Sequence, residues 1–101
     1  MRAIHLASLD KTRPVLVLTR EPVRPFLRHV TVAPITSRVR GLTTELPVGP
    51  ENGLDQACVV SCDNVTTIPV ELLGREVGAL LPTQEHLLTR ALAGAFDLQP
   101  D

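Results

Sequence analysis

Residues 11–19 read KTRPVLVLT, in which two cations and a hydroxyl stand directly before a proline and a compact apolar run. The run from Val15 to Leu18 is typical of a buried strand, and Pro14 suits a position near the start of one. A residue at the mouth of a strand anchored in the core is held more rigidly than a residue on a loop. The stretch therefore predicts a buried strand that holds Arg13 at its open end.

The rest of the chain predicts a single, mainly β domain over residues 1–101. Further strands are expected at residues 2–9, 29–35, 42–48, 57–62 and 75–80, which alternate or form short apolar runs. Only residues 82–96 repeat apolar side chains at intervals of three and four, as a helix does, with Thr83 as its expected N-cap. We expect a small twisted antiparallel sheet that curls into a barrel, with the C-terminal helix packed on it.

Composition excludes several classes of protein. The chain has only two aromatic residues, Phe26 and Phe96, which argues against a platform on which bases stack. It has neither an apolar run of the roughly 20 residues that a membrane span needs nor a signal-peptide pattern at its start. The sequence therefore predicts a cytoplasmic protein without a membrane partner.

The net charge of −1 is divided unevenly along the chain. Residues 1–40 carry eight Lys and Arg against two acidic residues, which gives +6, and residues 41–101 carry two Arg against nine carboxylates, which gives −7. Such asymmetry indicates contact between one half and a polyanion, and it also fits an ordinary charged surface or two halves that pair with each other.

The cysteines and histidines give no familiar catalytic pattern. Cys58 and Cys62 would lie about 13 Å apart along a strand, too far for a disulfide, and the other ligands of a zinc site are missing nearby. We expect two buried structural thiols and no metal site. A ribonuclease with two catalytic histidines could use His5 and His29 only if the barrel brings them together.

Three polar clusters stand at the ends of expected strands. One precedes the strand at residues 15–18, a second follows the strand at 29–35, and a third follows the strand at 57–62: Lys11, Thr12 and Arg13; Thr36, Ser37 and Arg38; Asp63 and Asn64. If the first two strands are antiparallel neighbours, the start of one lies beside the end of the other, and Arg13 meets Thr36 at one rim. Each cluster alone fits a solvated turn, but three at one rim indicate a site.

The order of these segments resembles a known family. TRPVLVLT (12–19), VTVAPITS (30–37) and VVSCDNVTTIP (59–69), followed by LLGREVGALLP (72–82) and the helix, are similar to the MazF/PemK-type toxins, and most similar to actinobacterial members. These toxins are sequence-specific endoribonucleases of bacterial toxin–antitoxin modules. The resemblance covers residues 2–98 and implies an SH3-like antiparallel β-barrel with a C-terminal α-helix, assembled as a homodimer.

The resemblance also implies the chemistry and the partners. It implies metal-independent cleavage of single-stranded RNA (mRNA, tRNA or rRNA) without a cofactor, in which the ribose 2′-hydroxyl attacks its own phosphate and leaves 2′,3′-cyclic phosphate and 5′-hydroxyl ends. A MazE-type antitoxin is the expected protein partner, with an acidic tail that lies across the basic groove and blocks RNA.

The resemblance assigns the catalytic pair to Arg13 and Thr36, and contacts with RNA to Asp63 and Asn64. Arg13 would stabilise charge on the phosphate and protonate the leaving 5′-oxygen, while the proton acceptor is left open between His5, Asp63 and water. Further RNA contacts are expected from side chains that flank the pair: Lys11, Thr12, Ser37, Arg38 and Arg40. The residues that choose the bases are expected within 20–28 and 37–42.

The chain departs from the pattern of this family at two places, and two other functions remain as alternatives. Asn64 stands where members commonly have glutamine, and residues 9–14 (LDKTRP) leave only a tight connection where most members have a longer loop. One alternative is a non-catalytic barrel that binds RNA or a partner. The other is a gyrase-poisoning toxin of the same fold, which uses an aromatic at the end of its last helix, whereas this chain ends AFDLQPD.

Overall fold

The computed structural model describes residues 2–98; residues 1 and 99–101, which include the end of the AFDLQPD segment, lie outside the described residues. The described chain forms seven strands and one α-helix in the order β1 (Ala3–Ser8), β2 (Thr12–Val17), β3 (His29–Thr36), β4 (Glu45–Val48), β5 (Cys58–Ser61), β6 (Thr66–Pro69), β7 (Leu73–Ala79) and α1 (Glu85–Ala95). Short 3₁₀ turns connect them: η1 (Glu21–Phe26), η2 (Pro50–Asn52), η3 (Cys62–Asn64), η4 (Val70–Leu72) and η5 (Pro82–Gln84).

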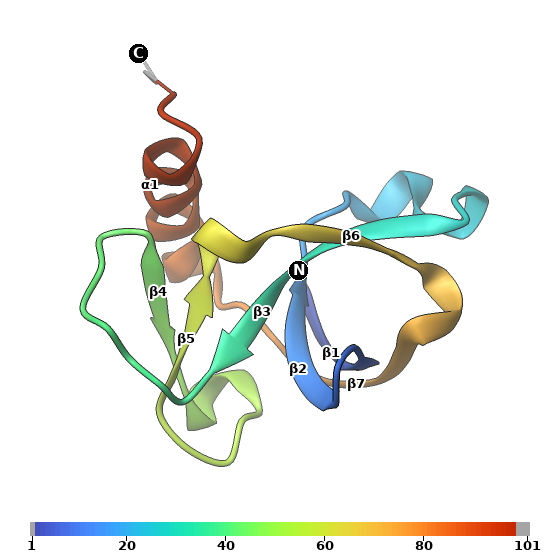
Figure 1. The fold of residues 1–101 in the computed structure, drawn as a ribbon, viewed down its shortest axis with the longest axis horizontal. Helices are drawn as coiled ribbons and strands as arrows, with labels where there is room; N and C mark the ends of the chain where they lie inside the picture. The colour runs from blue at the N-terminus through green and yellow to red at the C-terminus, as the bar shows by residue number, and fades with distance from the viewer. Residues whose placement is uncertain (1, 99–101) are drawn as a thin grey trace.

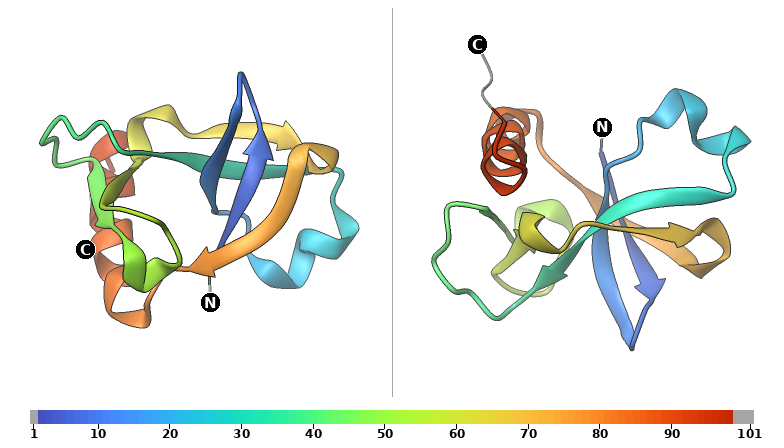
Figure 2. Two further views of the ribbon diagram at one scale, coloured as in Figure 1. Left: turned by 90° about the horizontal axis from the view of Figure 1, so that it is seen from below. Right: turned by 45° about the horizontal axis from the view of Figure 1, so that its top comes forward.

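The strands form one bent antiparallel sheet. The path of paired strands runs β4-β5-β3-β2-β1-β7, and β6 pairs with β3 beside this path. Within residues 2–98 the path is not closed into a hydrogen-bonded ring. Helix α1 stands beside β4 and β5, and η1 lies at the other side of the molecule (Figures 1 and 2). The predicted mainly β fold with a C-terminal helix is confirmed.

Two apolar cores hold this sheet in shape. The larger core packs the sheet against α1, with Ile4, Leu16 and Leu88 each at most 1% exposed. The smaller core is formed by side chains from β1, β2, β3 and β6. It contains Val15, Val32 and Ile68. β2 contributes to both cores because its successive side chains point to opposite faces. The strand that carries Arg13 is therefore packed on both of its faces.

Two prolines coincide with the end of the ladder between β2 and β3. The paired residues run only from Val17 opposite Val32 to Val15 opposite Pro34. Proline lacks a backbone N–H, so Pro14 and Pro34 cannot donate to such a ladder. β3 then changes partner, and Thr36 pairs with Val59 of β5. The mouth of β2 is thereby left open at the rim of the sheet.

The structure corrects several predicted boundaries. The strand expected at 42–48 begins only at Glu45, and β7 covers residues 73–79 instead of 75–80. Strand β6 was not predicted, because Ile68 is the only buried side chain in Thr66–Pro69. Thr83 is not the N-cap: it lies inside η5, and the helix begins after Gln84. No helix in the described part of the chain has the length and apolar character to cross a membrane.

A buried pair of amides replaces the missing cap. Gln84 Oε1 accepts hydrogen bonds from the Leu81 backbone N–H (2.8 Å) and from Asn52 Nδ2 (2.7 Å). Asn52 is 2% exposed; its Nδ2 also donates to Ala79 O (3.1 Å), and its Oδ1 accepts from the Gly49 N–H (3.0 Å). This network ties the β4–β5 connection to the end of β7 and to the start of α1.

Candidate active site

Arg13 and Thr36 lie at the same rim of the sheet. Continuing the β2–β3 register two residues past Val15 and Pro34 sets Arg13 opposite Thr36. Because side chains alternate along a strand, residues directly opposite each other point to the same face. The recorded pairs end at Val15 and Pro34, so this placement extends the register, and the catalytic role of the two residues stays a prediction.

Two hollows share this pair. The first, which we call the loop hollow, has a volume of about 520 Å³ and is lined by Leu9, Asp10, Arg13, Pro34, Thr36, Arg38, Arg40, Leu42, Glu45, Ser61, Asp63, Asn64 and Thr66. The second, the β7 hollow, has a volume of about 600 Å³ and is lined by Leu6, Lys11, Arg13, Pro14, Ile35, Thr36, Ser37, Gly53, Leu54, Asp55, Gln56, Cys58, Arg75, Glu76 and Val77. Arg13 and Thr36 are the two residues common to both lists, so the pair stands between the hollows.

Asp10 holds the guanidinium of Arg13. Both oxygens of Asp10 lie 3.0 Å from Arg13 Nη2, across the tight turn that joins β1 to β2. The Asp10 carboxylate also accepts the Lys11 backbone N–H (2.9 Å), and this bond together with the charge of Arg13 holds the pKa of Asp10 below its usual value. Arg13 Nε is buried and has no hydrogen-bond partner among the described residues. The guanidinium is thus oriented on one side and keeps an unused donor.

The hydroxyl of Thr36 is oriented by the loop that follows it. Thr36 Oγ1 accepts a hydrogen bond from the Arg38 backbone N–H at 3.1 Å. A threonine hydroxyl has one proton to donate besides its acceptor capacity. With the backbone N–H as its donor, the Thr36 hydroxyl keeps its own proton for another acceptor.

The third polar cluster lies in the loop hollow with this pair. The Thr44 hydroxyl donates to Asp63 Oδ2 at 2.6 Å, and Asn64 Nδ2 donates to the Ser61 hydroxyl at 2.7 Å. Asp63 and Asn64 belong to η3, directly after β5. The sequence-predicted Asp63 and Asn64 are therefore brought to the same hollow as Arg13 and Thr36.

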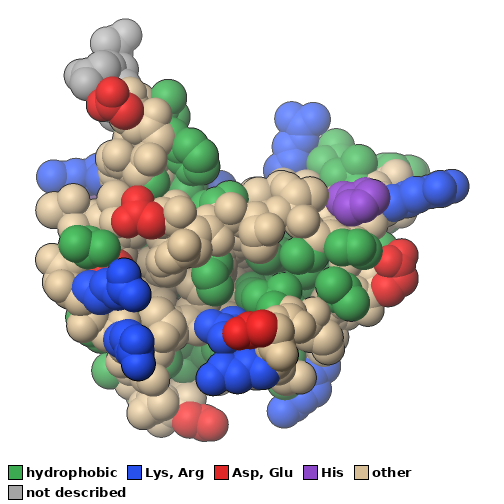
Figure 3. Space-filling view, viewed as in Figure 1, with side chains coloured by type: hydrophobic (Ala, Val, Ile, Leu, Met, Phe, Trp, Pro, Cys, Tyr) green, Lys and Arg blue, Asp and Glu red, His purple; other side chains and the backbone are tan. Residues whose placement is uncertain are grey.

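The remaining predicted residues are divided between the two hollows. Arg38 and Arg40 line the loop hollow, and Lys11 and Ser37 line the β7 hollow. Thr12 is exposed at the start of β2, opposite Ser8, and lines neither hollow. Figure 3 shows Lys and Arg side chains on both sides of the C-terminal end of β3. Most of the predicted cations thus surround the pair.

The histidines are not brought together at this rim. His5 Nδ1 lies 2.8 Å from Gly74 O, and its Nε2 lies 3.5 Å from Arg24 Nη2 and 3.7 Å from Glu76 Oε1. His5 lines neither hollow, and its recorded partners among the described residues do not include His29. The arrangement with two catalytic histidines therefore finds no support.

Both cysteines are free thiols, but the expected burial holds only for Cys62, because Cys58 is half-buried. Cys62 is 1% exposed, and burial together with the charge of Asp63 raises the pKa of its thiol to about 11. Burial also raises the pKa of Cys58, which is half-buried beside the β7 hollow. Neither thiol has the low pKa of a reactive cysteine.

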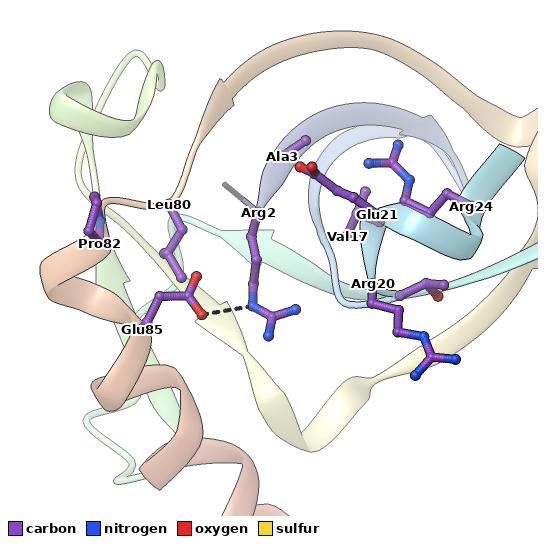
Figure 4. Close-up of a pocket in the computed structure, with 10 residues that line it drawn as sticks. Arg2, Ala3, Val17, Arg20, Glu21, Arg24, Leu80, Pro82 and Glu85 are labelled. Carbon is purple, nitrogen blue, oxygen red and sulfur yellow. Dashed lines mark hydrogen bonds and ion pairs between the residues drawn. The ribbon is translucent and has the colours of Figure 1, made fainter.

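A third hollow, of about 350 Å³, lies at the other ends of β1 and β2. Its lining includes Ala3, Val17 and Leu80, and the side chain of Arg2 points across it to Glu85, with 3.1 Å between Nε and Oε1 (Figure 4). It is lined by three residues of the segment 20–28, which was expected to help choose the bases: Arg20, Glu21 and Arg24. It contains neither residue of the predicted catalytic pair. The predicted catalytic pair lines the two hollows at the Arg13–Thr36 rim instead.

Four carboxylates that line the two hollows were not predicted as site residues: Asp10 and Glu45 in the loop hollow, and Asp55 and Glu76 in the β7 hollow. Asp10 stands only three residues before Arg13, and a charged residue in a turn has no sequence signal of its own. Glu45 lines the loop hollow because the long loop after β3 returns over it, a contact that depends on tertiary structure. For Asp10, the sequence offers one indirect signal, which is the opposite charge of Arg13 three residues later.

Comparisons with known proteins identify the family of the chain. The family described as PemK-like, MazF-like toxin of type II toxin–antitoxin system matches residues 5–96. Endoribonuclease MazF3 of Mycobacterium tuberculosis (strain H37Rv) is 64% identical over 98 residues, which cover 97% of this chain and 95% of the relative. The solved structure of Mycobacterium tuberculosis toxin MazF-mt6 superimposes with a TM-score of 0.97 at 63% identity and covers 98% of this chain and 100% of that chain.

A more distant solved structure shares the fold. An endoribonuclease in complex with its cognate antitoxin, from a mycobacterial species, has a TM-score of 0.86 at 23% identity and covers 98% of this chain and 95% of that chain. The matched family spans both strands of the rim, the third polar cluster and the helix. The chain therefore belongs to the PemK-like, MazF-like toxins of type II toxin–antitoxin systems, and it is an endoribonuclease of the MazF type.

Proposed function

We propose that this toxin cuts single-stranded RNA at a phosphodiester held between Arg13 and Thr36, without a metal ion or cofactor. The observation that carries this proposal is that the two residues, and no others in the described part of the chain, line both hollows. A guanidinium fork and a hydroxyl are suited to phosphate oxygens. RNA supplies its own nucleophile, so the protein needs no serine or cysteine for the attack.

In the proposed reaction the ribose 2′-oxygen forms a bond to phosphorus, and the bond from phosphorus to the 5′-oxygen breaks. The proton of the 2′-hydroxyl passes to an acceptor, and the leaving 5′-oxygen gains a proton. The products are a 2′,3′-cyclic phosphate and a 5′-hydroxyl end. The requirement for the 2′-hydroxyl makes RNA, and not DNA, the substrate.

Arg13 stabilises the negative charge that grows on the phosphate oxygens. A donor fixed in advance costs little reorganisation during the reaction, and the loss of one such donor reduces the rate by roughly a hundredfold or more. Thr36 donates its remaining proton to the same phosphate and holds it for in-line attack. Arginine is not deprotonated in proteins, so Arg13 acts on the leaving 5′-oxygen as a hydrogen-bond donor, and water supplies the proton that this oxygen gains.

The acceptor for the 2′-proton is the least defined part of this mechanism. His5 is disfavoured because it lines neither hollow. Asp63 and Asp10 line the loop hollow with the catalytic pair, so the proton passes to a carboxylate on that side or to water beside it. Asp10 is already engaged by Arg13, which favours an orienting role for it.

The RNA strand on either side of the cut would occupy the two hollows. Arg38 and Arg40 are suited to phosphates on one side, and Lys11 with Ser37 to those on the other. Asp63 and Asn64 present an acceptor and an amide to base edges. Binding that depends on phosphate contacts weakens steeply with added salt.

We further propose a homodimer controlled by a MazE-type antitoxin whose acidic segment covers the groove. The mycobacterial relative that was solved with its cognate antitoxin supports the second part. Exposed apolar side chains on and after the last helix support the first: Leu87, Phe96 and Leu98 are 41%, 57% and 60% exposed. Unchecked cleavage of cellular RNA would inhibit translation and growth.

The test is RNA cleavage by the purified toxin and by Arg13→Ala. The parent is expected to cut mixed RNA and to stop when the mapped cut carries a 2′-deoxy sugar. Folded Arg13→Ala is expected to lose at least about a hundredfold in rate. Cutting by Arg13→Ala at the parent's rate, or cutting of the deoxy substrate, would refute the mechanism.

A further inference from the structure

The loop that joins β3 to β4 carries two arginines of the site but no regular structure of its own. Residues 37–43 are all exposed, and Arg38 and Arg40 line the loop hollow from this segment. Fixing an exposed loop costs conformational entropy, which specific contacts must offset. The loop therefore needs an anchor if its arginines are to face the hollow in one arrangement.

Glu45, the half-buried first residue of β4, supplies that anchor. Its Oε1 accepts hydrogen bonds from the backbone N–H groups of Arg40 (3.1 Å), Gly41 (2.8 Å) and Leu42 (3.1 Å). Its Oε2 shares the Arg40 N–H at 3.2 Å. Three successive N–H groups that converge on one anion form the concave arrangement known as a nest. Gly41, with φ +78°, provides the left-handed residue that such an arrangement needs.

We propose that Glu45 is a positioning residue for RNA binding, whose carboxylate fixes the loop so that Arg38 and Arg40 meet RNA phosphates. The inference rests on the proposed function and names the element that controls the RNA groove. Glu45 acts through the loop and touches neither the cut bond nor the bases.

The loop is connected to the reacting groups at both of its ends. At its start, the Arg38 backbone N–H is the donor to Thr36 Oγ1 (3.1 Å). At its end, the Thr44 hydroxyl donates to Asp63 Oδ2 (2.6 Å). A change in the loop therefore reaches the catalytic hydroxyl as well as the arginines, with its main effect expected on the arginines because their side chains depend on the loop alone.

Whether Glu45→Gln weakens or strengthens RNA binding distinguishes a positioning role from a direct effect of the Glu45 charge on RNA. Glu45 is an anion that lines a hollow proposed to bind a polyanion. If its charge acted directly on RNA, Glu45→Gln would remove a repulsion and strengthen binding. If Glu45 positions the loop, the same variant weakens binding, because a neutral amide oxygen is a poorer acceptor for three N–H groups.

The experiment measures Kd for an RNA that carries a 2′-deoxy sugar at the mapped cut, and KM and kcat for the cleavable RNA. Glu45→Gln is expected to raise Kd and KM roughly tenfold, to change kcat by less than about threefold, and to make the dependence of log Kd on log salt shallower by about one. Glu51→Gln is the matched control: it removes the same charge from an exposed residue outside both hollows, and all three values should stay at those of the parent.

A second variant reaches the same loop without changing any charge. Gly41→Ala puts a Cβ into open space, but at a φ that alanine adopts only with strain. It is expected to raise Kd in the same direction, and the double variant should show less than the sum of the two effects, because both act on one loop conformation. If Glu45→Gln fails to fold, this variant carries the test.

Amide hydrogen exchange at residues 40–42 measures whether the hydrogen bonds to Glu45 hold the loop in place, and it does so in the absence of RNA. Faster exchange in Glu45→Gln together with weaker binding supports the proposal. Unchanged or stronger RNA binding by Glu45→Gln overturns it, as does unchanged exchange. A parent that binds the deoxy RNA through this loop but does not cut the cleavable RNA would refute the proposed function and leave the positioning role standing.

Discussion

Asp10 and Arg13 are joined through a single nitrogen: both carboxylate oxygens lie 3.0 Å from Nη2, while Nε of the same guanidinium is buried without a partner among the described residues. Asp10 is 74% exposed in its side chain and Arg13 only 25%. A buried donor without an acceptor is uncommon in native proteins and is often explained by function. The arginine is therefore held through Nη2 by an exposed carboxylate, while its Nε remains buried without an acceptor among the described residues.

Asp10→Asn is expected to lower kcat about tenfold, with KM unchanged or reduced. The amide loses the charged contact that orients Arg13, but it also removes a negative charge beside the bound phosphate. Single-turnover cleavage over a range of RNA concentrations separates the effect on the rate of cleavage from the effect on RNA binding. Glu71→Gln, on exposed η4, is the control for a lost carboxylate. An unchanged kcat in Asp10→Asn would show that the carboxylate does not orient the arginine.

Thr36→Val and Thr36→Ser separate the hydroxyl from the shape of the side chain. Valine is close in size but offers neither a proton to phosphate nor an acceptor to the Arg38 N–H, so the barrier should rise by about 3 kcal/mol. Serine keeps the hydroxyl and should stay within about tenfold of the parent. The measurement is kcat/KM for one defined RNA, and equal losses in both variants would contradict the role of the hydroxyl.

Asn52→Ala is expected to lower the free energy of unfolding by about 2–4 kcal/mol without lowering the activity of the molecules that remain folded. Truncation removes the hydrogen bonds of Asn52 with the Gly49 N–H and the Ala79 carbonyl, and it leaves Gln84 Oε1 with the Leu81 N–H as its remaining donor. Urea unfolding measures the change. The adjacent exposed residue provides the control, since Glu51→Ala should stay within about 0.5 kcal/mol of the parent.

Gly78→Ala tests the same junction by steric means. A Cβ at Gly78 would lie 1.7 Å from the Asn52 carbonyl oxygen, a backbone atom that cannot move independently of the Asn52 network. The substitution is expected to destabilise the fold by more than about 2 kcal/mol. A stable Gly78→Ala protein in the same urea experiment would show that the β4–β5 connection and β7 do not cross as closely as described.

The buried thiol of Cys62 makes stability depend on alkaline pH. Its pKa is raised to about 11 in the folded protein, against 9.0 for an unperturbed thiol, so the unfolded chain loses this proton first. The contribution is fully present below pH 9 and is lost as pH rises towards 11, by roughly 2–3 kcal/mol in total. Cys62→Ala should flatten this slope in urea unfolding from pH 8 to 11. The chain has no tyrosine and one lysine, so few other groups titrate there.

The strands that carry the proposed catalytic pair were predictable because their signal is local. Apolar runs identify β2 and β3, and polar residues at their ends identify the rim. Strand β6 gave no such signal, since Ile68 alone is buried and its neighbours Thr66 and Thr67 are exposed. A short edge strand with one buried residue looks like a loop in the sequence.

The residues that support the site were harder to predict than the pair itself. Glu45 accepts hydrogen bonds from backbone N–H groups, which every residue except proline has. The identities of residues 40–42 therefore do not indicate this contact in the sequence. The start of the helix was misassigned for a related reason: Thr83 has the side chain of a cap, but Gln84 makes the contacts through a distant partner, Asn52. The nuclease assignment, by contrast, came from the order of motifs, and family membership favours it over the two alternatives.

The first strand of the sheet pairs with the last. β1 is flanked by β2 and β7, and Ala3 lies opposite Ala79. Contacts between such distant parts of a chain form late, because a long stretch must be closed before they contribute. During synthesis, β7 and its wall of the groove can dock only after nearly eighty residues have left the ribosome. A chain that lacks β7 would therefore carry the arginine and the threonine without the side of the β7 hollow that Arg75, Glu76 and Val77 form.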